Sequence, residues 1–175
     1  MLQGAITSLK IDDSFIRRCL VLSKLSMAGY LFVDHFIWAA KLDLIRSDAK
    51  RLARTASWFW LAAILSNLAR NFYDISVIVR AELRRRKRVD QQKGISRGAV
   101  ADGAGRYGPC GIVARILDDR PVVVDTLKNA ADVFLPLATL ELFKTSEGFQ
   151  GLMGMVSSYM GLLATWNPAL KLVPA

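Results

Sequence analysis

The residues of this chain that could do chemistry are few and widely spaced. The single histidine, His35, follows Asp34 in an apolar stretch, and the cysteines Cys19 and Cys110 lie far apart. A histidine beside a carboxylate can act as a general base, but a lone one in an apolar helix more often serves packing. The cysteines lack the spacing of a metal site or a disulfide framework, which indicates a reducing compartment. The sequence therefore predicts no catalytic, cofactor-binding or metal-binding residues and no enzyme.

Glycines recur between residues 89 and 111, and this range was tested as a phosphate-binding loop. Gly103 and Gly105 have a suitable spacing, but no strand-like segment precedes them and no Gly-Lys-Ser/Thr follows. Phosphate-binding loops need both, because the lysine and the helix that follows contact the phosphates. The range 89–111 is therefore predicted to be a flexible linker.

Several charged residues fall within otherwise apolar segments, among them Asp34, Arg70 and Asp74. Charges at membrane depth cost several kcal/mol unless they are paired or face protein. Arg70 and Asp74 are one helical turn apart and could pair with each other, or Arg70 could reach Asp34 in the preceding segment. They are predicted as an intramembrane polar pair. The alternative is an amphipathic helix whose polar face is wet.

The last stretch, Gly148–Leu170, carries no charge and is close to the roughly 20 residues that a transmembrane helix requires. It is predicted to be a membrane span, the alternative being a buried helix of a soluble bundle. Small residues let helices approach closely in lipid. A helix-packing face is therefore predicted from Gly151, Gly154, Ser157, Ser158 and Gly161.

The remaining segments also have helical periodicity, so the fold is predicted to be an all-α integral membrane protein with one domain, residues 1–175. Residues 14–45 form either an in-plane amphipathic helix or a span, and residues 56–88 form an apolar helix with a basic end. Residues 121–144 form an amphipathic helix whose apolar face leaves Asp125, Lys128 and Asp132 on the far side. Residues 148–170 are the transmembrane helix. No internal repeat is evident.

Hydrophobic residues make up 53% of the chain, yet its net charge is +9. Both features fit a protein at an anionic phospholipid membrane, and the apolar excess argues against nucleic-acid binding. A run of basic residues is predicted to bind lipid headgroups, unless it is an ordinary solvated helix end or a nuclear-import-like patch: Arg80, Arg84, Arg85, Arg86, Lys87 and Arg88. Basic residues flank residues 57–79 on both sides, so charge leaves the topology open.

Four blocks of this sequence, in order, resemble the peroxisomal biogenesis factor 11 family. They are LSKLSMAGYLFVDHFIWAAK (22–41), SWFWLAAILSNLARNFYDI (57–75), VVVDTLKNAADVFLPLATLELFK (122–144) and GFQGLMGMVSSYMGLLATWNPALKL (148–172). The most specific motifs within them are Asp34 with Trp38, Asn67-Leu68-x-Arg70, Asn129-Ala130-x-Asp132 before Pro136, and Gly151-x-x-Gly154-x-Val156-Ser157-Ser158.

The resemblance implies an integral protein of the peroxisomal membrane that promotes membrane elongation, peroxisome proliferation and fission. It implies homo-oligomers and, as partners, a dynamin-related GTPase with its tail-anchored adaptor and the insertion receptor for peroxisomal membrane proteins. The alternative function is a channel for small metabolites. The family's longer N-terminal region, which includes a membrane-bending helix, is reduced here to residues 1–10, so autonomous tubulation is not expected.

Overall fold

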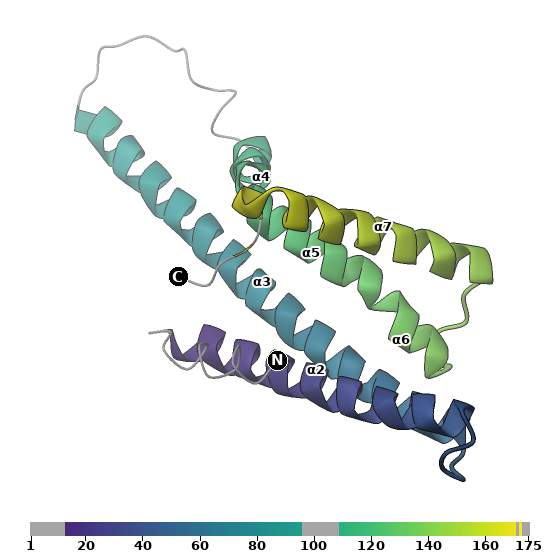
Figure 1. Cartoon of the computed structure of the whole chain (residues 1–175). Helices are drawn as coiled ribbons and strands as arrows, with labels where there is room; N and C mark the ends of the chain where they lie inside the picture. The colour runs from purple at the N-terminus through teal and green to yellow at the C-terminus, as the bar shows by residue number, and fades with distance from the viewer. Residues whose placement is uncertain (1–12, 96–108, 171, 173–175) are drawn as a thin grey trace.

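The structure is a computed structural model that describes residues 13–95, 109–170 and 172. The described residues form helices joined by turns, without strands, which confirms the all-α prediction for this part of the chain (Figure 1). The helices are, in order, α2 (Ser14–Lys41), α3 (Ala49–Ile95), α4 (Pro109–Asp118), α5 (Arg120–Asp132), α6 (Phe134–Thr139), α7 (Glu147–Trp166) and the short 3-10 helix η2 (Pro168–Leu170).

Helices α2 and α3 form an antiparallel hairpin, closely packed along α2 (Figure 1). Asp13 caps α2, because its carboxylate accepts hydrogen bonds from the first free backbone N–H groups. Near the middle of α2, Gly29 permits close approach, since a Cβ at this position would lie 2.8 Å from the Phe59 ring. At the far end, the rings of Phe15 and Tyr73 are 4.9 Å apart.

Helix α3 is much longer than its partner. It has 47 residues, about 70 Å at the usual rise per residue, and it begins and ends outside the predicted range 56–88. Beyond the contact with Phe15 it continues past the start of α2 and carries the basic run (Figure 1). It also extends to Ile95, into the predicted linker, of which residues 96–108 lie outside the described residues.

The second hairpin pairs α5 and α6 with the antiparallel α7 (Figure 1). Within the amphipathic range 121–144, Pro136 is predicted to kink or end the helix, and the helix does divide close to it, at Val133 between α5 and α6. Pro136 explains the break, because it has no N–H to donate to the carbonyl of the preceding turn. The ring of Phe134 contacts those of Phe143 and Phe149, which holds the turn against the start of α7.

The two hairpins turn in the same way. The first turn reads LDLIRSD (Leu42–Asp48) and the second reads LELFKTS (Leu140–Ser146). In both, the acidic residue is left-handed, with φ of 55° at Asp43 and 58° at Glu141. This conformation costs a non-glycine residue roughly 1–2 kcal/mol, so a shared departure from the ordinary backbone points to one repeated structure.

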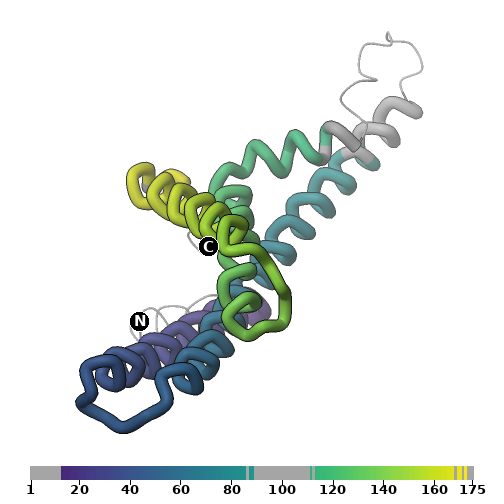
Figure 2. The backbone as a smooth tube through the Cα atoms, turned by 90° about the vertical axis from the view of Figure 1, so that its right-hand side faces the viewer, coloured from purple at the N-terminus to yellow at the C-terminus, as the bar shows by residue number. Residues whose placement is uncertain are grey.

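Their hydrogen bonds match as well. In the first turn the N–H of Leu44 donates to the carbonyl of Ala39, and in the second the N–H of Leu142 donates to that of Leu137, each at 3.0 Å. Figure 2 looks onto the end of the molecule that carries both turns. There the guanidinium of Arg54 and the carboxylate of Glu141 are 3.9 Å apart. The chain is thus two helical hairpins that turn at the same end.

Candidate functional site

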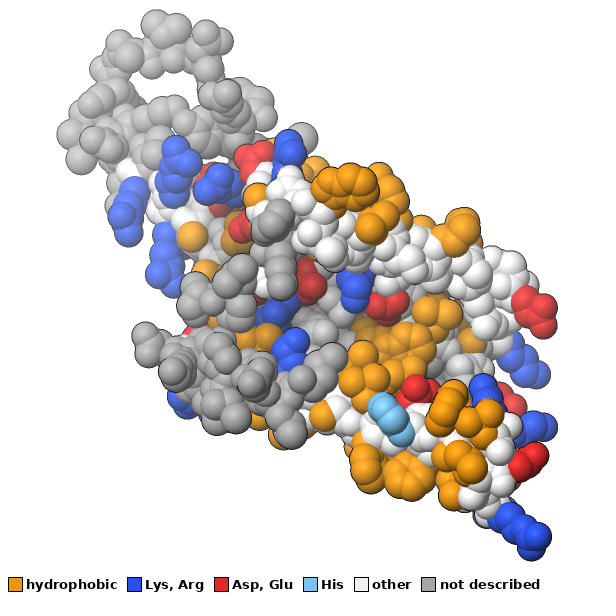
Figure 3. All heavy atoms as spheres, in the orientation of Figure 1, with side chains coloured by type: hydrophobic (Ala, Val, Ile, Leu, Met, Phe, Trp, Pro, Cys, Tyr) orange, Lys and Arg blue, Asp and Glu red, His pale blue; other side chains and the backbone are white. Residues whose placement is uncertain are grey.

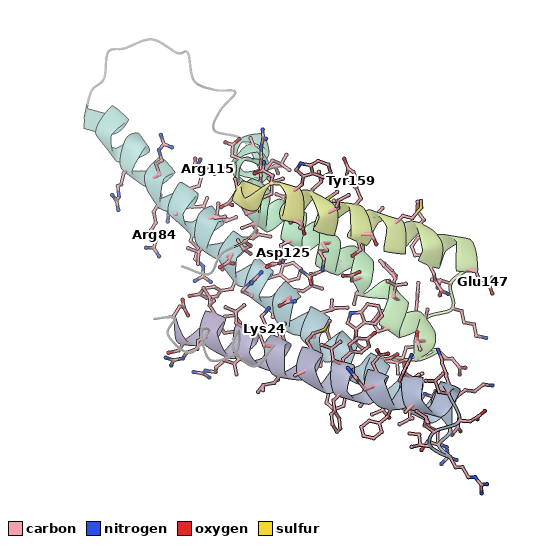
Figure 4. All side chains as sticks on the ribbon, viewed as in Figure 1. Lys24, Arg84, Arg115, Asp125, Glu147 and Tyr159 are labelled. Atoms are coloured by element: carbon pink, nitrogen blue, oxygen red, sulfur yellow. The ribbon has the colours of Figure 1, made fainter. Side chains whose placement is uncertain are left out.

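A buried polar cluster joins the two hairpins between α3 and α5. Arg70, whose side chain is 8% exposed, donates a hydrogen bond of 2.7 Å to Oδ2 of Asp125, which Figure 4 shows between the two helices. Arg70 also donates to the amide oxygen of Asn71 at 3.0 Å. Asn71, fully buried, donates to the same carboxylate oxygen at 2.9 Å. The charge of Arg70 is therefore matched by a carboxylate from the other hairpin.

Two more asparagines complete this polar cluster. The amide of Asn129 donates to the Oδ2 atom of Asp125 at 3.1 Å, and it also bonds the Asp125 carbonyl at 2.7 Å. Asn67 donates in turn to the Asn129 side-chain oxygen at 3.3 Å. Buried polar groups are costly unless they are hydrogen-bonded. The hydrogen bonds within the cluster meet this requirement. They also fix the register of α3 against α5, and so of one hairpin against the other.

This arrangement changes the predicted pairing of Arg70. Asp125 had been placed on the far side of its helix, yet it is the residue that Arg70 contacts. Asp34 is exposed on α2, and the described residues include no ion pair between it and Arg70. Asp74 lies one turn from Arg70 and interacts with it only through the longer-range field. The sequence could not reveal Asp125, because its partner lies in a distant segment.

Many large apolar side chains are exposed on the surface of the described helices. Helix α7 has large apolar side chains at intervals of three and four residues, all exposed: Leu152, Met155, Tyr159, Leu162 and Trp166. That spacing places them on one face of the helix. A protein surrounded by water rarely exposes such a continuous stripe, so it indicates contact with lipid or with a partner.

The first hairpin has the same character. Helix α2 exposes Leu22, Leu25, Phe32 and Phe36, and α3 exposes Trp58, Leu65 and Phe72 at seven-residue intervals. Meanwhile Ser23, Ser26 and Ser66 are buried. Among the described residues, α2 is the only helix whose length and apolar composition would allow it to cross a membrane, and most of it is not buried in the molecule. Helix α7, which was predicted to be the span, does not meet the same criterion of length and composition.

The predicted packing face of α7 divides into two parts. Ser157 is buried on the side that packs against α5, and a Cβ at Gly161 would lie 3.5 Å from the Lys128 side chain. In contrast, a Cβ at Gly151 or Gly154 would meet nothing within 4 Å. Ser158 is exposed. Part of the stripe is therefore used inside the chain, and the rest is open.

The basic run lies at the end of the molecule opposite the turns. Arg80, Arg84, Arg85, Lys87 and Arg88 are exposed on α3, while the side chain of Arg86 lies outside the described residues. Figure 4 shows Arg84 and Arg115 at this end and Glu147 at the other. These basic side chains are accessible to lipid headgroups, and the contact with headgroups stays a prediction.

A cavity of about 330 Å³ separates the basic run from the polar cluster. Asp13, Asp74 and Asp119 line it together with Arg70 and Tyr73. The hydroxyl of Tyr73 donates a hydrogen bond of 2.8 Å to Asp13, which lowers the pKa of that carboxyl. One of these carboxylates is therefore stabilised in its ionised form by a partner on α3.

Comparison with known proteins assigns this architecture to a family. The family described as peroxisomal biogenesis factor 11 (PEX11) matches residues 1–166. Human peroxisomal membrane protein 11B is 29% identical over 99% of the chain and 74% of its own length. Mouse peroxisomal membrane protein 11A is 28% identical over 98% and 72%. Yeast (Saccharomyces cerevisiae) peroxisomal membrane protein PMP27 is 26% identical over 89% and 64%.

No solved structure matches the chain. The family match covers nearly all of the sequence, including both hairpins and the five residues of the buried polar cluster. The relatives are named as membrane proteins of one organelle, in agreement with the apolar stripes. The chain therefore belongs to the peroxisomal biogenesis factor 11 (PEX11) family, and its location is the peroxisomal membrane.

Proposed function

We propose that this chain is an integral protein that elongates the peroxisomal membrane and promotes peroxisome proliferation and fission. The observation that carries the proposal is the reversed distribution of side chains. Large apolar residues face outward on α2, α3 and α7, while Arg70, Asn71 and Asn129 are buried inside. Lipid tails favour such a surface, and in lipid a buried polar cluster holds helices together.

Amphipathic insertion supplies the bending force in this proposal. A helix that lies in one leaflet expands that leaflet and favours curvature. The part of α3 beyond Tyr73, with its exposed arginines, fits this role. Helix α2 is the best candidate to cross the bilayer, and a C-terminal span in α7 belongs to the proposal on the basis of its length.

Self-association would concentrate these helices on the membrane. Gly151 and Gly154 support this step, because their side of α7 is open and could admit the backbone of a second copy. The partners implied by family membership are a dynamin-related GTPase, its tail-anchored adaptor and the peroxisomal insertion receptor. They enter the proposal as the machinery that would cut the elongated membrane and deliver the chain.

The test is expression in cells whose peroxisomes can be counted and measured. The double variant Met155→Asn with Leu162→Asn removes apolar contacts from the outward face of α7, and Glu147→Asn is its control at the exposed start of the same helix. We expect wild type and control to increase peroxisome number and length, and the double variant to lose the effect. Carbonate extraction must show that all three are inserted. Unchanged peroxisomes despite insertion of the wild type would overturn the proposal.

The alternative, a channel for small metabolites, rested on charged residues within apolar segments. One of them, Arg70, is paired with Asp125 inside the chain, so this residue has a structural use that needs no transported ion. Membrane shaping is therefore the better supported function. Purified protein in liposomes that releases small solutes, and stops doing so in an Asp74→Asn variant, would favour the channel instead.

A further inference from the structure

We propose that the two turns, Leu42–Asp48 and Leu140–Ser146, form one paired contact with the interfacial region of an anionic bilayer. The proposal requires that the chain resides at a membrane, as its family does, but not that it bends the membrane. The occupant is the boundary between lipid headgroups and acyl chains. Each of the two turns, which are similar in sequence, would contact this boundary.

The tips of both turns are apolar and exposed. Leu42 is 51% and Leu44 68% exposed in the first turn, and in the second Leu142 is 58% and Phe143 51% exposed. A solvated turn usually consists of polar residues, glycine or proline. Here Leu44 and Leu142, at equivalent places in the two turns, are both exposed, although Leu140, the counterpart of Leu42, is buried. An exposed leucine at the same place in both turns indicates that both tips leave water.

Cations surround these apolar tips. Lys41, Arg46, Lys50 and Lys144 are exposed, and none of them forms an ion pair among the described residues. Lysine and arginine can bury their aliphatic stems while their charged ends reach phosphate groups. Each such residue near an anionic surface is worth about 1 kcal/mol. A second copy of this chain would present the same cations, so charge favours the bilayer over self-docking.

The geometry brings both tips to one plane. Both turns lie at the same end of the molecule, and Arg54 of the first hairpin reaches Glu141 of the second. Figure 3 shows hydrophobic side chains at this end, with lysine and arginine along its edge. A pair of tips held side by side can enter an interface together, and each tip limits the tilt that the other alone would allow.

The experiment uses the full chain with Cys19 and Cys110 replaced by alanine. A polarity-sensitive dye is attached to single cysteines, Leu44→Cys or Leu142→Cys, in vesicles of phosphatidylcholine and phosphatidylserine. We expect nitroxide groups placed just below the headgroups to quench both dyes, and iodide in the water to quench neither. A dye at Asp118→Cys, exposed on α4 at the opposite end, is the control that iodide should reach.

Charge reversal tests the choice of occupant. Lys41→Glu with Lys144→Glu should shift the ratio of lipid-quenched to iodide-quenched dye by about fivefold per lysine in anionic vesicles. The matched pair Arg115→Glu with Arg120→Glu, exposed on α4 and at the start of α5 away from the turns, should leave both dyes in lipid. If this pair has the same effect, or if the lysine pair has none, the anionic contact is refuted.

Two outcomes at the dyes would also overturn the proposal. If iodide quenches the dyes at residues 44 and 142 as strongly as the dye at residue 118, the turns lie in water. If neither iodide nor the nitroxide groups quench them, the turns are covered by a second copy of the chain. Carbonate extraction separates this result from the proposed function. A chain that resists extraction but keeps its turns in water loses only the turn contact, whereas a chain that washes off loses integral membrane shaping as well.

Discussion

Asp125 stabilises the molecule through one oxygen atom, Oδ2, which accepts hydrogen bonds from Arg70, Asn71 and Asn129. Removing the carboxylate would leave the buried guanidinium unpaired. We therefore expect Asp125→Leu to lower the free energy of unfolding by about 3–5 kcal/mol. Thermal unfolding of the protein in detergent, followed by circular dichroism, measures this change.

The control for Asp125 is Asp34→Leu, which removes an exposed carboxylate and should change stability by no more than about 0.5 kcal/mol. Replacing both charges, as in Arg70→Met with Asp125→Leu, should recover part of the loss, since an unpaired buried charge costs more than an apolar pair. Equal losses for Asp125→Leu and Asp34→Leu would show that the cluster does not hold the hairpins together.

At the scale of the elements, Gly29 sets the distance between α2 and α3. A Cβ at this position would come within 2.8 Å of Cδ1 of Phe59, so the ring or the helix must move. We expect Gly29→Ala to destabilise the protein by about 1–3 kcal/mol, measured by thermal unfolding. Gly148→Ala is the matched control, because nothing lies within 4 Å of its added Cβ. Phe59→Leu should relieve the first variant; without that relief, the close contact is not the cause.

Helix α7 should use its two kinds of small residue differently. Ser157→Leu places a large side chain on the buried face against α5 and should lower the free energy of unfolding by about 1–3 kcal/mol. Gly151→Leu projects into open space and should leave the fold intact. If the open face binds a second copy, Gly151→Leu will instead reduce chemical cross-linking between chains. Unchanged cross-linking would remove this glycine from the oligomer contact.

Helical periodicity was sufficient to predict the elements but not their partners. The helices were predicted because their apolar residues recur every three to four positions. Asp125 was placed on the wrong side because the buried face of α5 contains the polar Asn129 together with Val122 and Ala131, and the polar contact with Arg70 could not be seen in either segment alone. The shared turn was missed because only its leucines are identical, while its acidic, basic and hydroxyl positions are conservatively exchanged.

The whole molecule is a pair of hairpins joined by a polar cluster, with its turns at one end and its basic run at the other. If α2 crosses the membrane, the antiparallel packing of α3 carries that crossing back, and both turns share one side. The basic residues at the two ends of α3 would then lie on opposite sides of the membrane, so their charge does not orient the chain. One group follows the first turn, and the other extends beyond the start of α2.

This arrangement predicts which sites are reached from each side of the membrane. Single cysteines in a cysteine-free background, Ser47→Cys and Lys144→Cys in the turns and Arg84→Cys and Asp118→Cys at the opposite end, are treated with an impermeant maleimide on sealed peroxisomes. We expect the two turn sites to react alike, and the other two to react alike with the opposite accessibility. Detergent should then make all four reactive. If the turn sites differ, the hairpins do not share a direction across the membrane, and if all four react before detergent, the bundle lies on one leaflet and α2 does not span.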